Sequence, residues 1–562
     1  MMRPEAILAA MNGVMAEQAA GLSQEQRVVL AQFLAGQTLE GEKLNETRPV
    51  KMCAEWESRF DFNRPPAFKG WGITRGNTRF IDGATAKLPA DAVPRLEVKW
   101  AFAYPNATRT RSQPSLAGGA VFVGSQDGTV YALDAATGCA RWTFRADAEV
   151  RTAIVVSDWA LGDTAAHPSA YFGDTGGTVY RLDAVTGQEI WKVEVDPHPA
   201  ATVTATPTLY DGRLYVPVSS TEWASAADPA YECCTFRGSV VALDAETGKQ
   251  LWKTWTIPQE PHLTGDTNPA GTPIWQPAGA PVWNSPTIDE KRDRLYVGTG
   301  ESYTSPASPF SDAILALDLK TGKLVWRYQA TAGDAWNMAC MLNDRTNCPA
   351  ENGPNFDFGA PPMLVTPKGG GDIIVAGQKS GYIHALDAST GHLIWRRKIG
   401  LGAHTSGIHW GMAAYDDVLF AANSDTRFLG RWAGTPPPGL FALDTVTGGQ
   451  VWFSPNDRPC PPDGNPRCDP GLSAAVTAIP GVVFTGGYDG WIRAYEAGTG
   501  KVIWSFDTAR DFETVNGSTA RGGSIEVAGP VVADGTVYVN SGHLYGGHMP
   551  GNVLLALAPA SP

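Results

Sequence analysis

One pattern of apolar and polar positions recurs along the whole chain. An alternating apolar run leads into Leu-Asp or a close variant, then Thr-Gly, and a Trp follows four residues after the Gly. The first copy spans residues 128–142, and the seven copies end at Trp142, Trp191, Trp252, Trp326, Trp395, Trp452 and Trp504. The alternation predicts a half-buried strand. Asp-x-x-Thr-Gly predicts a turn in which Asp accepts backbone N–H groups and Gly takes a positive φ. The Trp opens the next strand and can pack its ring between sheets.

Copies spaced roughly 50 to 75 residues apart predict radial repetition. The strand expected at 96–102 contains Trp100 but lacks a preceding turn, and the strand at 553–557 lacks a following Trp. We therefore expect the N-terminal strand to complete the blade that the C-terminal strand begins. The fold class predicted is an all-β, eight-bladed β-propeller. The alternative, an unrelated β-sandwich, would require seven chance matches.

The front of the chain follows a different pattern. Residues 3–35 have apolar residues at helical spacing, and 23–26 form a capping box. Gly13-Val-Met15, Gly21-Leu-Ser23 and 33–36 resemble the C-terminal end of a class I cytochrome c, in which the Met would be an axial haem ligand. Met15 is otherwise an ordinary apolar residue. Cys-x-x-Cys-His is absent from the sequence, so we expect no covalent haem.

We therefore divide the chain into three parts. Residues 1–40 are a truncated cytochrome c-like helical segment, 41–90 a linker or loop segment, and 91–562 the propeller. Blade insertions are longest between Trp191 and Trp326. Long loops on one face of a repeat array are where a functional site is usually built.

The net charge of −13, without a run of Lys or Arg, argues against nucleic acid or an anionic membrane as partner. No stretch of 18 apolar residues is present. Cys340 and Cys348, like Cys460 and Cys468, bracket short loops, which predicts local disulfides and an oxidising compartment. Adjacent Cys233 and Cys234 either bridge each other or pair elsewhere or stay free. We expect a periplasmic protein whose export signal lies outside these residues.

Candidate chemistry lies in the segments between blades. Glu222, Glu301 and Asp334 follow strands or lie in loops that should converge on the propeller axis. Carboxylates gathered there would repel one another unless a cation neutralised them, and oxygen ligands in an irregular site suit Ca²⁺. Each of them taken singly could equally be a solvated loop residue.

Cationic and aromatic residues occur in the same segments. Arg151 and Lys379 border apolar strands, and the indole of Trp283 could form a floor for a flat ligand. His409 precedes Trp410. Blade packing is the alternative role for the two tryptophans, and a satisfied core position is the alternative for the histidine.

The sequence resembles the pyrroloquinoline quinone (PQQ)-dependent quinoprotein alcohol dehydrogenases, in particular their members that oxidise polyvinyl alcohol. The resemblance extends from about residue 60 to 562 and is carried by segments 109–114, 233–238, 333–338, 358–363, 407–411 and 550–555. It implies an eight-bladed propeller with PQQ and Ca²⁺ on its axis. In many members a vicinal disulfide covers one PQQ face, but it comes before the Arg position, whereas Cys233-Cys234 comes after Glu222.

The resemblance also implies residue roles. Glu222 matches a Ca²⁺ ligand, Glu301 stands where the family has Asn or Asp as the next ligand, and Asp334 matches the proposed general base, which in some members also touches the metal. The implied contacts to PQQ or its surroundings are Arg111, Arg151, Thr204, Ser219, Trp283, Lys379, His409, which replaces an Asn of the family, and Trp491.

The function implied is PQQ- and Ca²⁺-dependent oxidation of secondary alcohol groups to ketones, with polyvinyl alcohol as substrate and an external cytochrome c or other acceptor taking the electrons. Two alternatives stay open. One is a PQQ dehydrogenase for another bulky hydroxyl compound, such as a sugar alcohol, polyether or mycotoxin. The other is a non-catalytic scaffold, which gives no reason for Glu222, Asp334 and Lys379 to converge.

Overall fold

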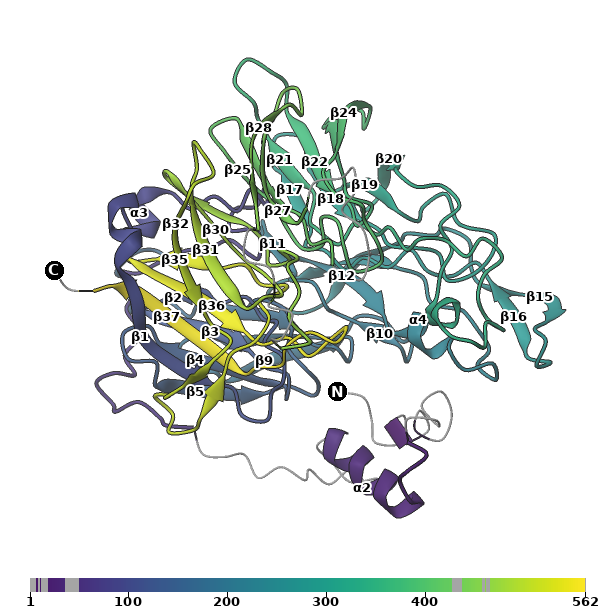
Figure 1. Ribbon diagram of the computed structural model, residues 1–562, viewed down its shortest axis with the longest axis horizontal. Coiled ribbons are helices and arrows are strands. Elements are labelled where there is room, and N and C mark those ends of the chain that lie inside the picture. The colour runs from purple at the N-terminus through teal and green to yellow at the C-terminus, as the bar shows by residue number, and fades with distance from the viewer. Residues whose placement is uncertain are drawn as a thin grey trace.

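The chain forms an eight-bladed β-propeller with irregular connections between its strands (Figure 1). The computed structural model describes residues 7–8, 11, 19–35, 50–426, 437–456, 460 and 465–560. In chain order the blades are β2–β5 (Ser115–Ala117, Ala120–Gly124, Thr129–Asp134, Ala140–Arg145), β6–β9 (Val155–Val156, Ser169–Gly173, Thr178–Asp183, Glu189–Glu194), β10–β14 (Ala201–Thr202, Thr208–Tyr210, Arg213–Ser220, Ser239–Asp244, Gln250–Trp255), β17–β20 (Thr287–Asp289, Arg294–Gly298, Ala313–Asp318, Leu324–Gln329), β21–β24 (Met363–Val365, Ile373–Gly377, Tyr382–Asp387, Leu393–Lys398), β25–β28 (Ala413–Tyr415, Val418–Ala422, Gly439–Asp444, Gln450–Pro455), β29–β32 (Thr477–Ile479, Val482–Gly486, Trp491–Glu496, Val502–Asp507) and β35–β37 with β1 (Val531–Ala533, Thr536–Ser541, Val553–Pro559, Leu96–Ala103).

The ring closes by the pairing predicted for the strands at residues 96–102 and 553–557. β1 pairs antiparallel with β37, in a register that sets Val98 opposite Leu557 and Ala103 opposite Val553. β37 also pairs with β36, so the N-terminal strand is the outermost strand of a sheet whose other strands come from the C-terminus. The two ends of the propeller sequence are thereby held in one blade, and the ring has no open edge there.

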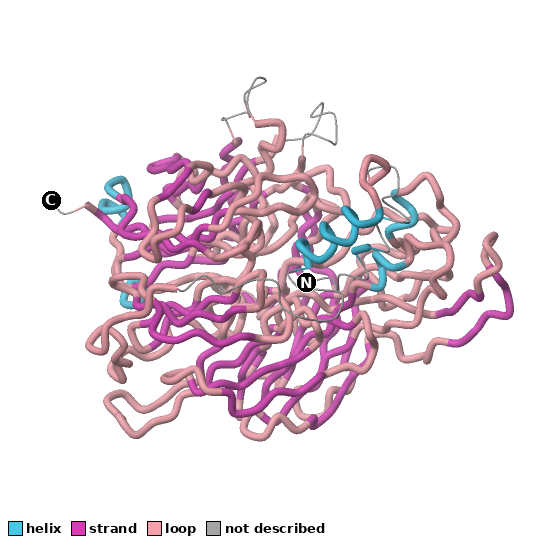
Figure 2. Tube along the Cα trace, turned by 90° about the horizontal axis from the view of Figure 1, so that it is seen from below, coloured by secondary structure: helices cyan, strands magenta, loops and turns pink. Residues whose placement is uncertain are grey.

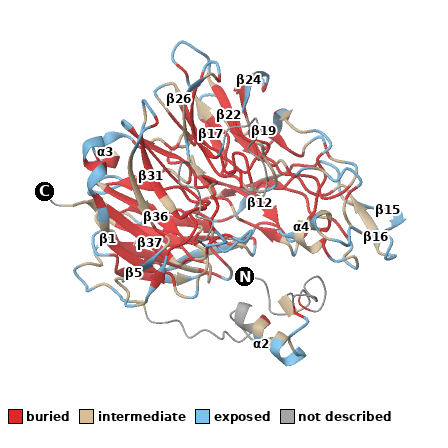
Figure 3. Cartoon of the chain, in the orientation of Figure 1, coloured by how far each residue is buried: buried red, intermediate tan, exposed pale blue. Residues whose placement is uncertain are grey.

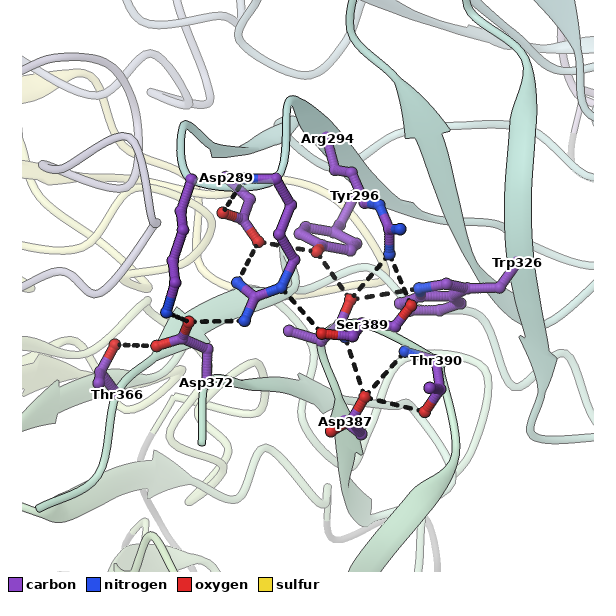
Figure 4. Close-up of polar contacts among 12 residues, drawn as sticks. Asp289, Arg294, Tyr296, Trp326, Thr366, Asp372, Asp387, Ser389 and Thr390 are labelled. Carbon is purple, nitrogen blue, oxygen red and sulfur yellow. Dashed lines mark hydrogen bonds and ion pairs between the residues drawn. The ribbon is translucent and has the colours of Figure 1, made fainter. Parts of the chain in front are cut away.

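The repeated turn has the geometry that its sequence predicts, as one junction shows (Figure 4). Asp387 Oδ1 accepts the backbone N–H of Ser389 and of Thr390, and also the Thr390 hydroxyl. The indole Nε1 of Trp326, in the preceding blade, donates to the carbonyl of Ala388 at 3.2 Å. Gly391 has a φ of 74° and lies so close to Trp326 that a Cβ there would be 2.5 Å from the ring. Turn and Trp therefore form one inter-blade joint.

Burial follows the position of each strand in its blade (Figure 3). The second strand β22 is buried throughout, whereas the fourth strand β24 is mostly exposed. The inner strands are therefore near-continuous apolar runs, and the outer strands form the rim of the disk.

Elements outside the blades are short (Figure 2). They are α2 (Gln24–Ala35), α3 (Gly83–Ala86), η1 (Ala90–Arg95), α4 (Glu222–Ser225), η2 (Met338–Met341), and the hairpins β15–β16 (His262–Thr267, Pro273–Gln276) and β33–β34 (Asp511–Phe512, Ala520–Arg521). The predicted capping box is confirmed, because the Ser23 N–H donates to Gln26 Oε1 and the Gln26 N–H donates to Ser23 Oγ. Met15 lies outside the described residues. Among the described helices, none has the length and apolar character needed to cross a bilayer.

Four disulfides are present, and the two predicted local bridges are confirmed. The other two join Cys53 to Cys139, which ties residues before the propeller to its first blade, and Cys233 to Cys234. The open question about the adjacent pair is thus answered in favour of a vicinal bridge.

We expect Gly391→Ala to destabilise the protein more than Gly369→Ala. Both glycines have a φ near +73°, but only Gly391 has the Trp326 ring against it, whereas nothing lies within 4 Å of a Cβ at Gly369. The difference isolates the ring contact and should be about 1–3 kcal/mol, the usual cost of overpacking. Thermal unfolding of the two variants measures it. Equal losses would show that the joint tolerates a methyl group.

Candidate active site on the propeller axis

The functional residues predicted from the sequence lie mostly at one end of the blades. Arg111, Arg151, Trp283 and His409 precede the first strands of their blades, while Lys379 follows the second strand β22. First strands begin, and second strands end, at the same face of an antiparallel blade. The same face carries the long connections 299–312 and 330–362, which contain the acidic residues of the site.

Four buried carboxyl groups gather around one ammonium group. Glu301, Asp312, Asp334 and Asp357 are at most 4 % exposed, and each interacts electrostatically with Lys379. The structure thus brings together the predicted residues Glu301, Asp334 and Lys379. It adds Asp312 and Asp357, which the sequence reasoning missed because they look like ordinary loop carboxylates.

Asp357 is the carboxylate closest to the predicted cofactor contacts. Its Oδ2 accepts Trp283 Nε1 at 3.1 Å and Lys379 Nζ at 2.9 Å, and its Oδ1 accepts the Glu301 N–H at 3.2 Å. Lys379 also donates to Asn355 Oδ1 at 2.8 Å and lies 5.0 Å from the Trp283 ring centroid. Burial alone would raise the pKa of Asp357, but Lys379 and these hydrogen bonds outweigh it and hold the pKa below its ordinary value.

The pKa values of Glu301 and Asp312 are shifted in the opposite direction from that of Asp357. Glu301 Oε2 and both carboxylate oxygens of Asp312 have no hydrogen-bond partner among the described residues. Burial, reinforced by the neighbouring carboxylates, raises the pKa of both groups well above its ordinary value. Glu301 and Asp357 are close enough to share a hydrogen bond. Buried oxygens without partners are unfavourable, and a bound proton or cation relieves the cost.

Asp334 supports the loop that carries Asp357. Its two oxygens accept the backbone N–H groups of Asn355 at 3.1 Å and Phe356 at 2.7 Å. Burial raises the pKa of Asp334 to about 6, although these amides oppose the shift. The predicted base is therefore buried near the cluster, with both oxygens engaged by backbone.

Glu222, the predicted metal ligand, is fully buried at the start of α4. Its oxygens accept the Tyr231 hydroxyl at 3.0 Å and the N–H groups of Thr235 and Phe236, both at 2.8 Å. These bonds fix the loop that contains the vicinal disulfide. A metal bound by Glu222 would compete with these donors.

A cationic cluster lies on the same face. Arg111 and Arg109 both pair with the buried Glu149, at 2.7 and 2.6 Å. Arg151 is half-buried and stacks over Trp410 at 4.9 Å, and its buried Nε has no hydrogen-bond partner within the described part of the chain. Burial, then the neighbouring Arg111, lowers the pKa of Arg151 to about 9. A guanidinium with an unbonded buried N–H, next to a second Arg, suits an anionic ligand.

His409 lies between Trp283 and a second buried acid. Its ring centroid is 6.0 Å from that of Trp283, and its Nδ1 is 3.5 Å from Glu526. Glu526 also accepts Trp410 Nε1 at 3.0 Å and pairs with His543. Burial lowers the pKa of His409 to about 3, so its imidazole is neutral at neutral pH. Glu526 and His543 were not anticipated from the sequence.

The three remaining predicted contacts lie toward the same face. Ser219 is near the end of β12, where it pairs with Thr202, and Thr204 follows β10. Trp491 begins β31 and donates its N–H to Asp489. All three predictions remain untested.

Among the described residues, one group of three acidic, His or Cys side chains has its ligand atoms within 4.8 Å of one another: Cys53, Glu57 and Cys139. Both of its sulfurs are in a disulfide. The axial carboxylates therefore do not form a closed cage. The unpartnered oxygen of Glu301, beside Asp357, nonetheless fits a divalent cation that takes further oxygens from a ligand or water.

Comparison with known proteins identifies the family of this chain. Residues 68–396 match the family model described as glucose/ethanol/alcohol dehydrogenase, beta-propeller domain, PQQ type, and 439–559 match that of outer membrane protein assembly factor BamB. A polyvinylalcohol dehydrogenase from Pseudomonas sp is 40% identical over 559 residues, covering 96% of this chain and 85% of the relative. Another, from Sphingopyxis sp. (strain 113P3), is 37% identical and covers 96% and 84%.

The chain thus belongs to the PQQ-type β-propeller dehydrogenases, and within them to the family of the polyvinylalcohol dehydrogenases. Among solved structures, the quinohemoprotein alcohol dehydrogenase ADHIIG from Pseudomonas putida HK5 is similar with a TM-score of 0.63, at 19% identity, covering 89% of this chain and 81% of that one. That likeness shows the shared fold.

We expect Ca²⁺ to stabilise the protein more at pH 7 than at pH 5. The pKa values of Glu301, Asp312 and Asp334 are raised in the folded protein. These carboxyl groups therefore stabilise the fold while they are protonated, and that stabilisation is lost as the pH rises through their folded-state pKa values. Ca²⁺ can take the place of the protons only after the groups have ionised. Apparent Tm with and without Ca²⁺ at both pH values measures the effect.

Glu301→Gln should remove most of the Ca²⁺ effect, and Glu55→Gln, at an exposed position, is the matched control. A Ca²⁺-induced Tm rise that is the same at both pH values, or that survives Glu301→Gln, would contradict a cation site at this cluster.

Proposed function

We propose that this protein oxidises the secondary hydroxyl groups of polyvinyl alcohol to ketones, using PQQ and a divalent cation bound on the propeller axis. The observation that carries the proposal is that Trp283, Lys379 and Asp357 meet beside Glu301, whose Oε2 has no partner among the described residues. The polymer is proposed because relatives named for it match nearly the full chain.

The residues present fit a planar, polyanionic quinone. Arg151, whose Nε lacks a hydrogen-bond partner among the described residues, and the neighbouring Arg111 offer cationic partners for carboxylates. Trp283 offers an aromatic floor, and its indole is fixed by the Asp357 bond. Lys379 would meet the quinone oxygens, and Glu301 with Asp357 would hold Ca²⁺. When bound, PQQ supplies the two-electron acceptor that the amino-acid side chains lack.

The proton chemistry belongs to the chain itself. Oxidising a secondary alcohol removes two electrons and two protons, and an ionised carboxylate must take the hydroxyl proton. Asp357 stays ionised at neutral pH because Lys379 lowers its pKa. We therefore place the base at Asp357 and give Asp334, the base inferred from the resemblance, the task of holding loop 355–356. The electrons then pass to an external one-electron acceptor, for which we propose a cytochrome c in the periplasm.

A scaffold without catalysis accounts poorly for the site. It would keep Glu301 Oε2, both Asp312 carboxylate oxygens and Arg151 Nε buried without hydrogen-bond partners among the described residues at no benefit.

Reconstitution tests the function. We expect the purified chain to oxidise polyvinyl alcohol with a dye acceptor only when PQQ and Ca²⁺ are both added. PQQ would bind the cationic residues around Arg151, and Ca²⁺ would bind the carboxylates around Glu301. Activity without either, or none with both on polyvinyl alcohol and on small secondary alcohols, would refute the proposal.

The same assay separates the two candidate bases. Asp357→Asn should lower kcat by about 10²-fold or more, the usual scale for loss of a general base. Asp334→Asn should have a smaller effect on kcat, because an Asn oxygen can still accept one of the two amides. A larger loss for Asp334→Asn would return the base to that residue.

A further inference from the structure

Residues 60–86 touch every blade of the propeller. We call this segment the clasp. It follows the first strands of the blades, and its contacts with Gly118, Glu290 and Gly535, in connections between first and second strands, lie at the face opposite the carboxylate cluster. It has no regular strand or helix apart from the single turn α3, and the sequence predicts a linker or loop segment here.

The second half of the clasp follows the blades in order. The Arg75 guanidinium lies 5.3 Å from the Tyr210 ring of β11, and the carbonyls of residues 75, 76, 78, 79 and 85 accept the N–H groups of Ile288, Leu364, Ala414, Ala478 and Asp534. Each of these donors except Asp534 lies in the first strand of its blade; Asp534 follows the first strand β35. The clasp therefore runs from the third blade to the eighth.

The first half of the clasp contacts the other two blades. The Ala67 N–H donates to the Leu116 carbonyl in β2, at 2.9 Å. The Phe62 carbonyl accepts Trp159 Nε1 at 2.8 Å, in the connection between β6 and β7. One continuous segment thus fixes the first strands, or the loops that join them, around the whole ring.

Trp71 extends from the clasp toward the site. It packs in one apolar cluster with Trp410, Ala475, Val527 and the floor residue Trp283. The Arg79 guanidinium stacks on its ring at 4.4 Å and donates to its carbonyl at 2.7 Å. A Cβ on Gly411 would be 2.7 Å from the Trp71 ring, so the ring needs a glycine there. Arg79 and the backbone at Gly411 therefore both restrict the indole.

Arg79 anchors this contact. It is fully buried, and besides the Trp71 carbonyl it donates to the Val476 carbonyl at 2.7 Å, Gln113 Oε1 at 2.6 Å and Thr477 Oγ1 at 2.8 Å. The four acceptors come from the clasp itself, from the segment before β2, and from two adjacent residues at the start of β29. Such a network transmits position, since no member can move without breaking a buried bond.

We propose that Trp71 is a positioning residue for the cofactor site: it supports Trp410 and Trp283 from the far face of the propeller. The clasp is then part of the site. The proposal rests on the proposed function only in taking PQQ as the ligand of that floor.

The test compares five variants with the wild type. Trp71→Ala should weaken PQQ binding about tenfold, the scale of one aromatic contact, with smaller loss for Trp71→Phe. Gly411→Ala should weaken it by crowding the ring, and the double variant Trp71→Phe, Gly411→Ala should bind better than Gly411→Ala alone. Trp56→Ala, at a position 70% exposed, is the matched control and should bind as the wild type.

PQQ affinity is read from the half-saturating concentration in the dye assay, and folding from far-ultraviolet circular dichroism and Tm. If Trp71→Ala does not fold, Trp71→Phe and the Gly411 pair decide. Folded variants with a lowered Tm but wild-type PQQ affinity would overturn the proposal, because support of the fold alone predicts that pattern.

A second readout needs no cofactor. In protein labelled with 5-fluorotryptophan, the ¹⁹F resonance of Trp283, assigned by Trp283→Phe, should shift in Trp71→Phe and stay in place in Trp56→Ala. A wild-type protein that binds no PQQ would refute the proposed function, while an unmoved Trp283 resonance would refute the role of Trp71.

Discussion

One hydrogen bond, made eight times, joins the blades of this protein. The indole N–H at the start of each outer strand donates to a backbone carbonyl of the next blade; the donor–acceptor pairs are Trp100–Ala135, Trp142–Ala184, Trp191–Glu246, Trp252–Leu319, Trp326–Ala388, Trp395–Thr445, Trp452–Ala497 and Trp504–Leu96. Seven of the acceptors belong to the repeated turn, where a glycine with a φ between 68° and 75° lies against the ring. The repeated sequence therefore encodes the contact between neighbouring blades, and these contacts fix the positions of the loops around the ring.

The rigid ring makes an unfavourable charge arrangement possible on the axis. Loops anchored at both ends hold Glu301, Asp312 and Asp357 in a buried space with one lysine, which only partly neutralises them. On the same face, the buried Nε of Arg151 has no hydrogen-bond partner among the described residues. Excess negative charge beside an Arg with an unbonded N–H is the complement of a divalent cation bound next to a polyanion. The fold's stability sustains this strain, which a ligand would relieve.

The sequence predicted what depends on local, repeated chemistry. The repeated turn and Trp predicted the blades. The incomplete copies of the repeat at residues 96–102 and 553–557 predicted the pair of strands that closes the ring. Glu222, Glu301 and Asp334 were predicted to converge; Glu301 and Asp334 lie near Lys379, whereas Glu222 is bound by the 231–236 loop. Asp357 was missed because its role comes from Lys379 and Trp283, which are distant in sequence. The clasp was missed because each of its residues bonds to a different blade, so it has no periodicity. Glu222 was predicted as a ligand by motif, while its hydrogen bonds to the 235–236 loop are visible only in three dimensions.

The location of the bound cation tests this account most directly. A crystal of the chain grown with Ca²⁺ and PQQ, measured at a wavelength where calcium scatters anomalously, would show the metal without reference to activity. We predict one strong peak per chain, with oxygen ligands that include Glu301 and Asp357 on the axis. A peak bound at Glu222 away from these two residues, or no peak while PQQ is bound, would contradict the claim that the axial carboxylates hold the metal.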